Sequence, residues 1–176
     1  MEVSRPLMHA IADRHDVTVY LSRVVGPSST QLLDWAGAGF QGAGFQMDVY
    51  FTAGRRYFPL VGAPGIVLAA YSEESRKTLL AEFSKVGWHR KPSASEISAR
   101  IAAMRADGFA AGRENLLRGL TRLSAPILSQ AGDLVMVMTG AGHAPRLEGA
   151  KLDALGCDMV AGARRISDAL RMVRLD

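Results

Sequence analysis

A long stripe of apolar residues near the C-terminal end of the sequence most constrains the fold. From about residue 147 to residue 173 they recur at alternating intervals of three and four, as Leu152, Leu155, Met159, Ala163, Ile166, Leu170 and Val173. This spacing places the side chains on one face of an α-helix. It predicts one long amphipathic helix, whose apolar face needs another element to cover it.

Strand signals are grouped rather than alternating with helices. β-branched and aromatic residues predict a strand at 17–25, and two further strands are predicted at 30–36 and 45–52. Two more are predicted much later, at 122–129 and 134–139. The last is a continuous apolar run, which is typical of a central strand covered on both faces.

Helix signals lie before the first strand and between the two groups of strands. We predict a short helix at 5–14 and a buried one at 66–71. A third helix is capped by Ser72 and runs to about residue 85. A fourth begins at the capping-box pair Ser93 and Glu96 and ends at Gly108. Segregated strands and helices in this order predict an α+β domain with a largely antiparallel sheet flanked by helices.

Length and composition fit a single soluble domain. The chain has 176 residues, of which 48% are hydrophobic and 22% charged. It has no apolar run long enough to span a bilayer and no signal-peptide core, and its single cysteine suits a reducing compartment, so we expect a cytoplasmic protein. The net charge of +4 comes from short basic pairs interleaved with acids. That distribution argues against a nucleic-acid-binding face on this chain.

Glycines 37–42 spell the pattern G-x-G-x-x-G, which in another setting binds a nucleotide. That chemistry needs a strand before the glycines and a helix after them. Here a predicted strand follows instead, so we interpret the segment as a flexible connection between strands.

No catalytic motif is present. The four histidines lack ligand spacing and are expected to be surface or loop residues, and there is no G-x-S-x-G nucleophile motif. Cys157 lies beside Leu155 and Met159 on the predicted long helix, where we expect a small buried hydrophobic residue. We therefore predict no catalytic residue, no metal site and no cofactor, and a protein that binds rather than catalyses.

The segment GLTRLSAPI at 119–127 resembles the conserved tract of the effector-binding domain of IclR-type transcription regulators. In that family the tract reads Gly-[Leu/Val]-x-x-[Ile/Leu]-[Ala/Ser]-Ala-Pro-[Val/Ile]. Three other segments are similar to family segments: RYFPLVGAPGIVLA at 56–69, MRADGF at 104–109 and ARRISDAL at 163–170. The resemblance covers nearly the whole chain and implies a GAF-like fold, with a small-molecule pocket between the sheet and a helix.

Carried over by this resemblance, the effector pocket is lined by Gly62, Ala63, Gly112, Leu120, Arg122, Val137 and Thr139. Amides at the helix start at Gly62 and Ala63 suit a carboxylate, and Arg122 suits a bidentate clamp on it. Gly62 is equally well explained as a plain helix-entry glycine.

Several positions depart from the family pattern. Val61 replaces the usual histidine, Gly65 the usual lysine, and Gly112 stands where several members have an acidic residue. With Met136, Met138 and Phe58 expected nearby, these losses favour an aromatic or branched carboxylate as effector.

The resemblance implies an effector-sensing and oligomerisation domain, as homodimer or tetramer, spanning residues 1–176. The family's winged helix-turn-helix is not in this sequence, so we expect DNA binding only through that domain. The chain is then a truncated piece, which we favour, or a free-standing sensor. Two alternatives stay open: an enzyme using the same pocket, and a purely structural dimerisation module.

Overall fold

The computed structural model describes residues 3–37, 56–57, 62–113 and 118–172. Within these residues, six antiparallel strands form one sheet in the order β3-β2-β1-β6-β5-β4. The strands are β1 (Thr18–Val24), β2 (Thr30–Ala36), β3 (Arg56–Tyr57), β4 (Ala110–Arg113), β5 (Leu120–Leu128) and β6 (Leu134–His143). Their order places β1 and β6 at the centre of the sheet.

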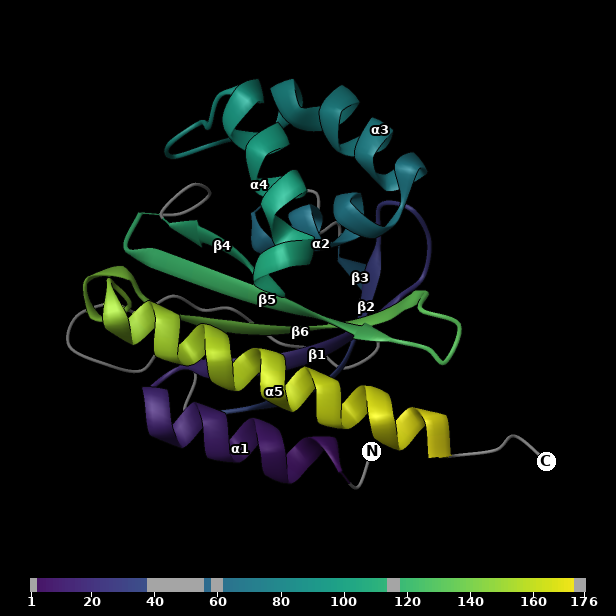
Figure 1. Cartoon of the computed structure of the whole chain (residues 1–176). Coiled ribbons are helices and arrows are strands. Elements are labelled where there is room, and N and C mark those ends of the chain that lie inside the picture. Colours follow the sequence, from purple (N-terminus) through teal and green to yellow (C-terminus); the bar gives the residue numbers. More distant parts are fainter. Residues whose placement is uncertain (1–2, 38–55, 58–61, 114–117, 173–176) are drawn as a thin grey trace.

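Helices cover both faces of this sheet (Figure 1). The helices α1 (Ser4–His15) and α5 (Ala150–Met172) lie on one face, and α2 (Ala63–Tyr71), α3 (Glu73–Glu82) and α4 (Ala94–Asp107) form the layer on the other. Two short 3₁₀ turns, η1 (Phe83–Lys85) and η2 (Ala144–Arg146), complete the described elements. This arrangement confirms the predicted α+β class with its long C-terminal helix.

Each helical layer has its own apolar core. The stripe of α5 packs on the sheet and on α1, and five of its predicted members are buried: Leu152, Leu155, Met159, Ala163 and Ile166. Leu170 is 38% exposed, and Val173 lies outside the described residues. On the other face, the buried residues of α2 pack with Leu79, Ile101 and Val137. The central strand β6 contributes to both cores, as its continuous apolar run predicted.

The predicted helix boundaries are confirmed by their capping bonds. The Ser75 amide donates to Ser72 Oγ at 3.1 Å at the start of α3. At the start of α4, the Glu96 amide donates to Ser93 Oγ and the Ser93 amide donates to the Glu96 carboxylate, so the capping box is complete. Gly108 ends α4 in the left-handed conformation.

The structure differs from the sequence-based expectations at β4 and Cys157. The expected strand at 45–52 and all but the first glycine of the 37–42 motif lie outside the described residues. The strand β4 was not expected, because its sequence AAGR contains no β-branched or aromatic residue. The expectation of a buried Cys157 is wrong, because its side chain is exposed. Two helical positions turn the chain by about 200°, so Cys157 faces away from both Leu155 and Met159.

Candidate functional site

Strand register brings polar side chains into two rows on the sheet face below α2. Side chains alternate between the faces of a sheet, so residues paired across neighbouring strands share a face. One row crosses four strands through Thr18, Ala141, Arg122 and Gly112, and the next through Tyr20, Thr139, Ser124 and Ala110. Residues far apart in sequence thus form one continuous surface.

The N-terminus of α2 lies directly against Arg122. Gly62, the residue before α2, has φ +86° and ψ −153°, and a Cβ built on it would lie 2.9 Å from Arg122 Nη2. A side chain at position 62 therefore meets the guanidinium group. The absence of a Cβ lets the guanidinium group approach the start of the helix closely.

The first turn of α2 is rich in polar backbone groups without a side-chain cap. No side chain caps the helix at Gly62, and the first intrahelical bond runs from the Ile66 amide to the Gly62 carbonyl. Pro64 has no N–H, so the remaining amides of the first turn are those of Ala63 and Gly65. These amides form the positive end of the helix dipole.

Ser124 and Thr139 form a buried hydroxyl pair in the second row. Their Oγ and Oγ1 atoms are 2.8 Å apart, and both residues are buried. Each hydroxyl has one donor and two acceptor sites, so one O–H of the pair remains after this bond. Thr139 thus makes a structural hydrogen bond that the sequence could not show.

Thr18 brings an unexpected polar group to the first row. Its residue is 1% exposed, and its Oγ1 atom has no hydrogen-bond partner within the described part of the chain. Leaving a buried hydroxyl unpaired costs about 1–3 kcal/mol. The sequence alone does not identify Thr18 and Tyr20 as members of these rows. Side chains alternate along β1, but the register of β1 against β6 decides which of them share a face with Arg122.

The seven predicted pocket residues do not all meet. Gly62, Ala63, Arg122 and Gly112 gather at the start of α2, with Gly112 opposite Arg122 in the β4–β5 ladder. The other three lie elsewhere on the same face. Thr139 is one row away, and Val137 packs in the core under α2. Leu120 is one row away on the other side of Arg122, opposite His143.

Two residues invoked for effector size lie on the other face of the sheet. Met138 is fully buried in the core below α5, and Met136 packs against that same core. Phe58 lies outside the described residues. The expectation that both methionines border the pocket is therefore wrong, because even-numbered residues at this part of β6 point away from Arg122.

The gathered groups suit an anion. A guanidinium next to a helix N-terminus puts two positive features together, and a carboxylate placed beside both interacts favourably with each. Among the described residues, no three His, Cys, Asp or Glu side chains gather as a metal-binding group. Within the same residues, no helix combines the length and apolar character needed to cross a membrane.

Sequence comparison finds no matching protein-family model and no matching curated protein. Comparison of structures finds proteins with the same fold. An IclR transcriptional regulator from Alicyclobacillus acidocaldarius matches with a TM-score of 0.75 at 14% identity, over 96% of this chain and 67% of that one. The IclR of Thermotoga maritima matches with a TM-score of 0.75 at 18% identity, with the same coverages.

A third structure matches along nearly its whole length. It is a targeted domain of an IclR-family transcriptional regulator, with a TM-score of 0.73 at 17% identity, over 96% of this chain and 95% of that one. This chain thus spans about two thirds of the two longer regulators and nearly all of the isolated domain. These matches confirm the architecture that the tract at 119–127 implied: the chain has the fold of the C-terminal domain of IclR-family transcription regulators.

Proposed function

We propose that this chain is the effector-binding and oligomerisation domain of a cytoplasmic transcription regulator, and that it binds a small carboxylate. One observation carries the proposal: the Arg122 guanidinium lies within 2.9 Å of the Cβ position at Gly62, at the N-terminus of α2. The shared fold with IclR-family regulators supports the regulatory role.

The geometry favours a carboxylate over a neutral effector. An anion beside both the Arg122 guanidinium and the N-terminus of α2 is attracted by each of them and accepts hydrogen bonds from them. Arg122 has a planar fork of donors that matches two carboxylate oxygens.

In this proposal DNA binding belongs to a separate domain of the intact regulator. Effector binding at α2 then changes DNA affinity through a coupling free energy, typically about 1–3 kcal/mol. The relatives are transcription regulators rather than enzymes, so we propose no turnover of the bound acid.

The test is thermal unfolding of the chain with a panel of aliphatic and aromatic carboxylates and their uncharged amides. An acid at about 100 times its dissociation constant adds about 2.7 kcal/mol to the free energy of unfolding. We expect a saturable shift with one class of acid and none with its amide. Arg122→Gln should weaken binding about ten- to a hundredfold, because a hydrogen bond to a charged group is lost.

Arg113→Gln is the matched control. Arg113 is on β4 next to Gly112, is exposed, and lies in a different register pair from Arg122. Equal loss of binding in both variants, or no shift with any acid, contradicts the proposed site. Consumption of the acid during the measurement contradicts the assignment as a binding domain.

A further inference from the structure

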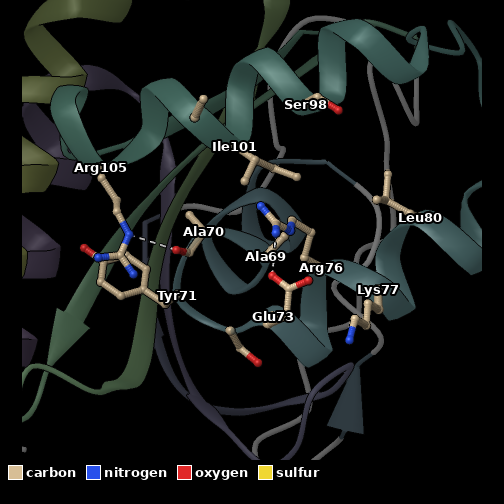
Figure 2. A pocket seen from close by; sticks show the side chains of 12 residues that line it. Ala69, Ala70, Tyr71, Glu73, Arg76, Lys77, Leu80, Ser98, Ile101 and Arg105 are labelled. Carbon is tan, nitrogen blue, oxygen red and sulfur yellow. Dashed lines mark hydrogen bonds and ion pairs between the residues drawn. The ribbon is translucent and has the colours of Figure 1, made fainter.

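An open groove runs between α3 and α4, over the C-terminal end of α2 (Figure 2). It has a volume of about 640 Å³, and every residue that lines it is described. We call it the α3–α4 groove. It lies on the outer helical layer, away from Gly62 at the opposite end of α2.

The middle of the α3–α4 groove is apolar. Ala69 and Ile101 form buried parts of its wall, and Leu80 is 45% exposed beside them. In Figure 2, Leu80 and Arg105 lie at opposite ends of the groove. Leu80 is thus the apolar side chain of the groove that a partner surface reaches most readily.

The rim of the α3–α4 groove is positively charged. Its acid, Glu73, is already neutralised by Arg76, at 2.5 Å between Nη2 and Oε2. Lys77 and Arg105 remain. Arg105 donates to the Ala70 carbonyl at 2.9 Å and lies 4.6 Å from the Tyr71 ring centroid, and both of these partners are neutral. Its charge therefore remains available to a partner.

A second hollow of about 370 Å³ continues this surface beyond the Tyr71–Arg105 pair, which lines both. It lies between β5 and α5 and adds Arg164 and Arg171. Its acid, Asp168, is paired with Arg171 at 3.3 Å. The joined surface thus keeps three cations whose charge no lining acid neutralises: Lys77, Arg105 and Arg164.

We propose that the α3–α4 groove docks an acidic amphipathic helix of a partner protein. The apolar face of that helix packs on Leu80 and Ile101, and its carboxylates face Lys77, Arg105 and Arg164. Grooves between helices bind amphipathic helices in this way. Charge complementarity selects an acidic partner and rejects a basic one.

The same observations disfavour other occupants. Nucleic acid needs a dense row of cations along its phosphates. The α3–α4 groove has an apolar centre, and two of the five cations that line the two joined hollows are paired with acids. A second copy of this chain carries a net charge of +4 and brings like charge to the rim.

The experiment measures fluorescence anisotropy of labelled peptides with the full chain. The probe is a peptide of about 18 residues, long enough to form a helix, with leucines at helical spacing and glutamates elsewhere. Two matched peptides replace every glutamate by lysine or scramble the order of residues. We expect the acidic amphipathic peptide to bind, and both matched peptides to bind at least about tenfold more weakly.

Variants of the chain locate the binding. Lys77→Glu and Leu80→Ser change exposed residues of α3, and each should weaken binding at least about fivefold. Lys151→Glu makes the same change in net charge at an exposed position on α5 outside both hollows and should leave binding within about twofold. Circular dichroism checks that each variant is folded, and amide chemical shifts show whether the peptide contacts α3 and α4.

Several results would overturn the proposal. Equal binding of the scrambled peptide, or equal losses in Lys77→Glu and Lys151→Glu, would mean that only diffuse charge attracts the peptide. Shift changes confined to another face, or no binding of the acidic peptide, would exclude the groove as its site. A DNA duplex that binds the chain and competes with the peptide in a Lys77-dependent way would assign the groove to nucleic acid instead.

Discussion

At the scale of single residues, Gly62 is the position where one added carbon should disturb the candidate site most. Its φ of +86° with ψ −153° lies in a region almost reserved for glycine, and a Cβ there would be 2.9 Å from Arg122 Nη2. Gly62→Ala should lower the free energy of unfolding by about 1–3 kcal/mol, measured by urea denaturation. It should also displace the guanidinium and weaken acid binding.

Gly87→Ala is the control for that prediction, because a Cβ at Gly87 would meet nothing within 4 Å. If Gly62→Ala is as stable as Gly87→Ala and binds the acid equally well, Arg122 does not lie close to the start of α2. A loss of stability with unchanged acid binding would mean that Gly62 is needed for its backbone conformation but not for binding the acid.

The sequence could identify only part of this site. Gly62 and Arg122 follow from two separate segments that each resemble a family segment, whereas Thr18 and Ser124 join them through strand register. Register depends on pairing between residues more than a hundred positions apart, such as Thr18 with Ala141. A sequence pattern can show that successive side chains of β6 lie on opposite faces of the sheet. It does not show which face packs against α2 and which against α5, so Met136 and Met138 were expected on the wrong face.

At the scale of elements, α1 is attached to α5 by a charged contact as well as by the apolar core. Asp158 on α5 lies 2.8 Å from His15 Nε2 and 3.0 Å from Arg14 Nη1. The hydrogen bond from His15, with a further contribution from Arg14, holds the pKa of the Asp158 carboxyl below its usual value against partial burial. The ionised carboxylate is thus favoured by the folded state.

This contact makes the docking of α1 pH-dependent. A lowered carboxyl pKa contributes stability above the unfolded-state value of about 4, and that contribution is lost as pH falls through the folded-state pKa. Asp158→Asn should therefore cost about 1 kcal/mol at pH 7, and the difference from wild type should shrink towards pH 3. Urea denaturation at both pH values measures it.

Asp13→Asn is the control, since Asp13 is exposed in the last turns of α1. Removing a negative charge near a helix C-terminus is neutral or slightly stabilising. A constant difference between wild type and Asp158→Asn from pH 7 to pH 3 would mean that the carboxylate charge does not hold α1 in place.

Elements with local signals were predictable, and elements defined by tertiary contact were not. The capping box of α4 and the stripe of α5 are written in neighbouring residues. In contrast, β4 exists because β5 offers it an edge. His15 was expected at the surface or in a loop, yet it ends α1 with a side chain only 10% exposed, because α5 supplies Asp158.

At the scale of the whole molecule, the two helical layers share the same strands. Val137 and Met138 are neighbours in β6, but Val137 packs below α2 and Met138 below α5. Loss of either layer therefore exposes apolar residues of the shared sheet. An effector bound at α2 should stabilise α1 and α5 as well, because separating the layers would leave one face of the sheet uncovered.

The two tryptophans test this coupling because they lie in different parts of the fold. Trp35 is on β2, and Trp88 follows η1 beside the outer helices, where its Nε1 donates to the Phe83 carbonyl at 3.0 Å. In the single-tryptophan variants Trp35→Phe and Trp88→Phe, fluorescence and far-ultraviolet circular dichroism should give the same urea midpoint within each variant. A carboxylate that binds should raise both midpoints together.

Separate midpoints for the two signals within one variant would show that the outer helices unfold without the sheet. The effector would then stabilise α2 alone, and a signal from α2 could not reach α1 through the folded core. Coincident transitions that shift equally with ligand would instead mean that occupation of the Arg122 site is felt by the whole domain. That is the minimum requirement for a sensor whose output lies outside this chain.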